Sequence, residues 1–179
     1  MKKISASWLP WLAAAALSVA CASAQAGAPT MLERMQAENG QHIGEKLPAT
    51  LWVDDRAGTR ITLAGVLKGP GWVVVVSPGC QPCQELIDYL RAHQGRSPQG
   101  YPVALLSFER DRALLRQVPR DIPLYVSVVP RKDSFFSGTM TPALFFFDKN
   151  HNLLGRQSGL VGTPESTLSV PAAIVKSLR

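Results

Sequence analysis

Unbroken apolar runs mark the strands that this chain is expected to form. Residues 71–77, GWVVVVS, contain four consecutive valines, and such β-branched runs are typical of a central strand that is buried on both faces. Similar runs are bounded by proline, glycine or charged turn residues, and they predict further strands at residues 102–108, 122–129, 142–148 and 153–159.

Apolar residues spaced three and four apart predict helices between these strands. From Pro82 onward, Leu86, Ile87 and Leu90 form one apolar stripe, which stops at about Gly95. The same kind of pattern predicts helices at residues 30–38, 109–118 and 170–178.

Residues 47–69 have the pattern of a strand, a turn and a second strand, with the turn at residues 55–58.

Strands that alternate with helices predict an α/β fold, a sheet with helices on both faces. Residues 27–179 are enough for one domain with a substantial core.

Residues 1–26 have the pattern of a secretory signal peptide. Lys2 and Lys3 are followed by an apolar stretch at residues 8–20 and then by small residues, with cleavage expected after Ala24 or Ala26. The alternative is an uncleaved segment that anchors the domain to a membrane. Export is therefore predicted, and membrane contact is expected only if this segment is retained.

The charge of the chain is positive but dispersed. The formal net charge is +6, and two of these charges are Lys2 and Lys3 in the predicted leader. The remaining basic residues form no dense block and few aromatic residues lie among them, which argues against nucleic-acid binding. A docking face for an acidic partner stays open.

Cysteine usage points to redox chemistry. Cys21 falls in the leader, so the exported domain keeps only Cys80 and Cys83, whereas a small disulfide-stapled domain carries four or more cysteines at wider spacings. Cys80 stands where a buried strand ends and a helix begins, and a helix N-terminus lowers a thiol pKa. Cys80 is then the attacking nucleophile, and Cys83, one helical turn on, is the resolving thiol.

Three other interpretations of the pair are weaker. A disulfide that closes so short a loop would constrain the unfolded chain little. A metal site needs about four ligands, and His42, His93 and His151 follow no ligand spacing, although two thiols and a histidine could hold copper in a maturation factor. Residues 77–80, SPGC, also faintly match a thiol-peroxidase motif. No metal and no cofactor is expected.

Two stretches together resemble a known family. Residues 61–83, ITLAGVLKGPGWVVVVSPGCQPC, and residues 138–159, GTMTPALFFFDKNHNLLGRQSG, resemble the periplasmic thioredoxin-like thiol–disulfide oxidoreductases of the TlpA/ResA/DsbE type. The resemblance covers the chain roughly from Gly44 to the end. It implies that residues 27–179 form a thioredoxin-like domain of the periplasm, which is anchored to the inner membrane if the leader is retained. The fold of this domain has a central mixed sheet, an N-terminal hairpin extension and a central insertion between Cys83 and Pro142.

The resemblance also assigns site residues and partners. It implies that Pro142 is cis, that Thr141 and Pro142 contact the substrate, and that Gly79, Gln81 and Pro82 form the active-site loop. It implies a reductase in protein or cytochrome c maturation, which acts on a disulfide-containing client protein and receives electrons from a membrane thiol donor. An oxidase or isomerase role stays open.

The chain departs from that family at three positions. Gly79 replaces a tryptophan before the first cysteine, Val74 occupies the place of a buried acid in thioredoxin, and Leu86 replaces a glutamate after the second cysteine. Glu85 lies one position early, about 100° away around a helix, so it receives no acid–base role. These departures leave the reduction potential open and keep the exchange chemistry.

Overall fold

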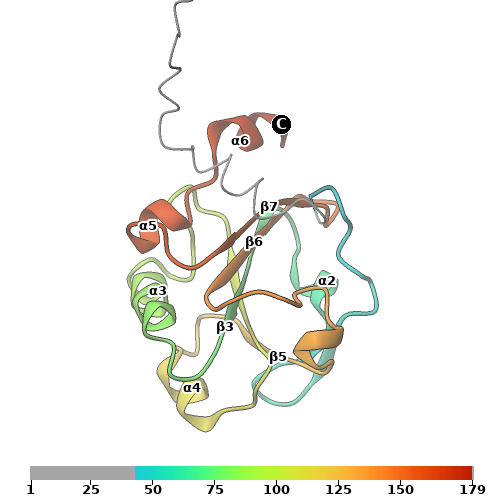
Figure 1. Ribbon diagram of the computed structural model, residues 1–179, viewed down its shortest axis with the longest axis vertical. Coiled ribbons are helices and arrows are strands. Elements are labelled where there is room, and N and C mark those ends of the chain that lie inside the picture. Colours follow the sequence, from blue (N-terminus) through green and yellow to red (C-terminus); the bar gives the residue numbers. More distant parts are fainter. Residues whose placement is uncertain (1–42, 179) are drawn as a thin grey trace, which may run out of the picture.

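A single seven-stranded sheet organises the part of the chain that the computed structural model describes, residues 43–178 (Figure 1). The strand order is β2-β1-β5-β4-β3-β6-β7. The strands are β1 (Trp52–Asp54), β2 (Arg60–Thr62), β3 (Gly71–Val76), β4 (Val103–Ser107), β5 (Leu124–Ser127), β6 (Ala143–Phe147) and β7 (Leu153–Ser158).

Strand β3 lies at the centre of this sheet, as its valine run predicts. It pairs in parallel with β4 and antiparallel with β6, so the sheet is mixed. All six of its residues are buried, because side chains pack on both faces of the strand. Each strand predicted from an apolar run is confirmed, although the turn residues at the ends trim it by one or more positions.

Helices pack on both faces of the sheet. Helix α3 (Gln81–Ala92) contributes Leu86, Ile87 and Leu90 to a core cluster on the face of Val74 and Val76, and α4 (Arg112–Gln117), α5 (Pro164–Thr167) and α6 (Ala172–Ser177) lie on or beside it. The opposite face is covered by the short α2 (Leu63–Val66) and by Phe136, which follows the 3-10 helix η1 (Arg131–Asp133). Every helix within residues 43–178 is too short or too polar to cross a membrane.

The predicted hairpin extension and central insertion are both present. Strands β1 and β2 form an antiparallel hairpin, and β1 joins the sheet by pairing with β5. The insertion consists of α4, β5 and η1, which lie between β4 and β6 in the chain. Helix α4 of this insertion packs into the same core cluster as α3, the helix that begins at the cysteines.

Short elements depart from the sequence expectation. Leu63 was expected in the second strand of the hairpin, but it begins α2, because the Thr62 hydroxyl accepts the Gly65 N–H and caps a helical turn. Neither α5 nor η1 was predicted, since four or three residues are too few to show a helical period. The predicted helix at residues 30–38 and the predicted leader lie outside the described residues.

The turn between β6 and β7 depends on one carboxylate. Asp148 Oδ1 accepts the backbone N–H groups of Asn150 and Asn152, each at 2.8 Å, and Oδ2 accepts the Asn152 side-chain amide at 2.9 Å. Burial alone would raise the pKa of Asp148, but these hydrogen bonds and nearby His151 outweigh it and hold the pKa below its ordinary value.

Replacing Asp148 by alanine is expected to lower the free energy of unfolding by about 1–3 kcal/mol at neutral pH, because the hydrogen bonds to the carboxylate are lost. Since the folded pKa is the lower one, this stabilisation is present above the unfolded pKa of about 3.9 and disappears as the pH falls through the folded value. Urea unfolding of both proteins at pH values from neutral down to below the unfolded pKa of Asp148 checks the prediction. Lys149→Ala, at the exposed neighbouring position, serves as control. A difference in unfolding free energy between wild type and Asp148→Ala that stays the same at every pH would contradict it.

Candidate functional site

The loop that follows β3 delivers the first cysteine to the start of a helix. Gly79 has φ +72°, in the left-handed region where glycine is unstrained, and this lets the chain turn sharply after the strand. Cys80 is the N-cap residue of α3, and Pro82 lies in the first turn, where its missing N–H costs nothing. Gln81 is exposed beside it.

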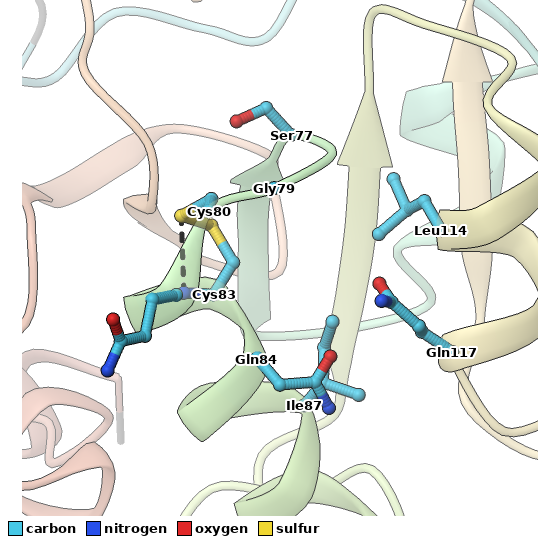
Figure 2. Close-up of a pocket in the computed structure, with 9 residues that line it drawn as sticks. Ser77, Gly79, Cys80, Cys83, Gln84, Ile87, Leu114 and Gln117 are labelled. Atoms are coloured by element: carbon cyan, nitrogen blue, oxygen red, sulfur yellow. Dashed lines mark hydrogen bonds between the residues drawn. A yellow bond between two sulfur atoms is a disulfide. The ribbon is translucent and has the colours of Figure 1, made fainter.

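Cys80 and Cys83 are joined by a disulfide. The two sulfurs differ in access, because Cys83 is only 1% exposed whereas Cys80 is partly exposed. The backbone N–H of Cys83 points to the Cys80 sulfur at 3.2 Å (Figure 2). In the reduced protein such a donor at a helix N-terminus favours the Cys80 thiolate over the thiol.

A second loop meets the cysteine loop at the same end of the sheet. Val75 is opposite Ala143 in the β3–β6 ladder, so residues 141 and 142 come alongside the end of β3. The Thr141–Pro142 peptide bond is cis, the form that the family resemblance implies. The hydroxyls of Thr141 and Ser77 are hydrogen-bonded at 2.7 Å, which ties the two loops together.

A pocket of about 260 Å³ opens beside the disulfide (Figure 2). Cys80, Cys83 and Gly79 line one side of it. The side chains that complete the pocket come from the end of β3, from α3 and from α4, and they are Ser77, Gln81, Gln84, Ile87, Leu114 and Gln117.

The structure brings the predicted residues together and adds others. Cys80, Cys83, Gly79 and Gln81 line the pocket, whereas Thr141 joins the site through Ser77, and buried Pro142 donates no N–H but accepts one from Gly159 at 2.7 Å. Sequence reasoning missed the roles of Ser77, Gln84, Leu114 and Gln117. The one available signal was that Leu114 falls in the predicted helix at residues 109–118, where the apolar spacing indicates an inward position.

The surroundings of the disulfide carry little charge. None of the residues that line the pocket is ionisable apart from the cysteines. Val74 is fully buried where thioredoxin has an acid, and Glu85 is exposed and absent from the pocket lining. The site therefore depends on the helix N-terminus for electrostatic stabilisation of a thiolate.

Neither histidine within residues 43–178 lines the pocket beside the disulfide. His93 ends α3 and stacks on Tyr89, with ring centroids 4.0 Å apart, while His151 bonds the Leu67 carbonyl at 2.8 Å. Within residues 43–178 no three histidine, cysteine or acidic side chains gather into a group that could hold a metal ion. His42 and Cys21 lie outside the described residues.

Comparison with solved structures identifies the fold as thioredoxin-like. A provisionally assigned thiol:disulfide interchange protein DsbE from Chlorobium tepidum matches with a TM-score of 0.56 and 18% identity, over 76% of this chain and 98% of that one. The thioredoxin domain of a thiol-disulfide oxidoreductase from Bacteroides vulgatus matches with a TM-score of 0.53 and 16% identity, over 78% and 99%. At the level of sequence, no protein-family model and no curated protein matches.

Proposed function

We propose that this protein is a thiol–disulfide oxidoreductase that acts on protein disulfides. The observation that carries the proposal is the cysteine pair itself, which joins a partly exposed sulfur at a helix N-terminus to a buried sulfur one turn further on. That difference in access separates an attacking thiol from a resolving thiol. The thioredoxin-like fold and the names of its structural neighbours support the same chemistry.

The exchange proceeds in two displacements. In the reduced protein, the Cys80 thiolate attacks one sulfur of a client disulfide, forms a mixed disulfide, and releases the other client sulfur as a thiolate. Cys83 then loses its proton and attacks the Cys80 sulfur, which releases the second client thiolate and regenerates the Cys80–Cys83 disulfide. Two electrons pass from the protein dithiol to the client, and the product is the Cys80–Cys83 disulfide.

Thr141 and Pro142 are proposed to contact the client. They lie just before β6, at the end of the sheet where Cys80 is placed, and Thr141 is hydrogen-bonded to the cysteine loop through Ser77. An extended client segment that pairs with the backbone at Thr141 would bring its own cysteine to Cys80.

The physiological setting is proposed from the sequence. The leader pattern at residues 1–26 supports export to the periplasm, and the family resemblance supports reduction of a client in protein or cytochrome c maturation, with electrons from a membrane thiol donor. No described cluster of ligands favours the copper-binding alternative.

The reduction potential of the Cys80–Cys83 couple tests this proposal. Equilibration of the exported domain in graded glutathione buffers is expected to give about −270 mV or lower, as for a reductase that needs a dedicated donor. A value near −120 mV would replace the reductase assignment with an oxidant or isomerase. A pair that does not cycle in any buffer would overturn the oxidoreductase function altogether.

A further inference from the structure

The pocket between α3 and α4 has an apolar floor. Ile87 from α3 is 1% exposed and Leu114 from α4 is 2% exposed, and both line the pocket (Figure 2). Because these two side chains expose almost no surface, the favourable free energy comes from the entering group, whose own apolar surface leaves water when it enters the pocket. The floor therefore favours an aliphatic group.

The rim of the pocket is polar but neutral. The polar residues that line the pocket are Gln81, Gln84, Gln117 and Ser77, and none of them is charged. Each carboxamide offers both hydrogen-bond donors and an acceptor, which matches the N–H and C=O groups of a peptide backbone. An ionised side chain placed here would lose water without meeting an opposite charge, which is costly.

A chain of hydrogen bonds fixes the two walls of the pocket relative to each other. Gln84 Nε2 donates to Asp88 Oδ1 at 3.0 Å, and Arg91 Nη1 donates to the same oxygen at 2.7 Å. Arg91 Nη2 then donates to the backbone carbonyl of Gln117 at 3.1 Å, which connects α3 to the end of α4. Asp88 and Arg91 form an ion pair with each other and neither lines the pocket, so the bonds hold the walls without charging them.

We propose that this pocket is a specificity subsite, which receives an uncharged aliphatic side chain next to the reactive cysteine of the client. The inference rests on the proposed exchange function. Cys80 itself lines the pocket, so a client sulfur bonded to Cys80 places the adjoining client residues at its mouth. A volume of about 260 Å³ lies below the range of about 300–1,000 Å³ found for drug-sized ligands, which suits a single side chain.

The test uses symmetric disulfides of short capped peptides that have one cysteine each. The residue on either side of the cysteine is leucine, aspartate or lysine, and the reduced protein is mixed with each peptide disulfide and quenched with acid for mass analysis. Relative to the rate of each peptide disulfide with free dithiothreitol, the leucine peptides are expected to react at least about tenfold faster than the aspartate and lysine peptides, because only leucine enters the pocket without taking a charge out of water. A symmetric disulfide gives the same product whichever sulfur is attacked.

A variant pair assigns the preference to this pocket. Gln117→Glu places a carboxylate on the rim at an exposed position, and it is expected to favour the lysine peptides over the aspartate peptides by about fivefold relative to wild type. Arg116→Gln is the matched control, because it changes the net charge by the same amount at the neighbouring residue of α4 but lies outside the pocket. It should leave the order of the peptides as in wild type.

The possible results distinguish a failure of the proposed subsite from a failure of the proposed exchange function, on which the subsite rests. If the reduced wild-type protein fails to reduce a small reagent such as 5,5′-dithiobis(2-nitrobenzoate), the exchange function itself is wrong. If it reduces the reagent but treats all peptides alike, only the subsite is overturned. An equal response to lysine peptides in Gln117→Glu and Arg116→Gln would attribute any preference to net charge and would also overturn the subsite.

Discussion

Replacing Cys80 by serine is expected to lower the rate constant for reduction of a protein disulfide by about a thousandfold or more, because the attacking sulfur is lost. Cys83 cannot take over this role efficiently. It is 1% exposed, whereas Cys80 is partly exposed at the helix N-terminus and receives the Cys83 N–H. Turnover of a disulfide-containing protein substrate with a chemical reductant measures the loss.

Replacing Cys83 by serine is the matched experiment, because it should stop the cycle at a different point. Cys80 still attacks, but no neighbouring thiol resolves the mixed disulfide, so a covalent complex with the client accumulates and survives acid quenching. Non-reducing electrophoresis and mass spectrometry reveal this complex. A stable complex formed by Cys80→Ser and absent from Cys83→Ser would reverse the two roles.

The sequence predicted those parts of the fold that depend on local pattern. Four consecutive valines are compatible with little except a strand buried on both faces, and β3 is that strand. A tight cysteine pair at the junction of a strand and a helix likewise restricts the chemistry to a few possibilities, of which thiol exchange is the foremost. Leu63 shows where such reasoning fails, because a single hydroxyl cap on Gly65 turned a strand residue into the start of a helix.

The rest of the site could not be predicted because it depends on which elements meet in space. Ser77 and Thr141 lie 64 positions apart in the chain, and only the β3–β6 register brings their hydroxyls to 2.7 Å. Leu114 and Gln117 face the cysteines because α4 packs beside α3, which no periodicity within α4 specifies. Tertiary packing, rather than residue type, gives these residues their role.

Phe136 connects the core to the loop that carries Thr141 and Pro142. Its ring is fully buried and meets Phe145 edge-on, with centroids 4.6 Å apart. Its backbone is held as well, since its N–H donates to Ser134 Oγ at 3.1 Å and its carbonyl accepts from the Thr139 hydroxyl at 2.9 Å. The buried ring and these two hydrogen bonds thus anchor the loop between η1 and β6.

Phe136→Ala is expected to lower the free energy of unfolding by about 3–5 kcal/mol, because the buried ring leaves a cavity that the sheet cannot fill. Phe135→Ala is the matched control. That neighbouring ring is only partly buried, so its loss should cost about 1–2 kcal/mol. Urea unfolding of the three oxidised proteins gives these differences. Equal losses, or a larger loss for Phe135, would mean that the loop is anchored elsewhere. A larger loss for Phe136→Ala than for Phe135→Ala would mean that packing in the core positions the loop before Pro142. The rate of exchange with a protein client should then be lower in Phe136→Ala than in wild type, at temperatures where the variant is still folded.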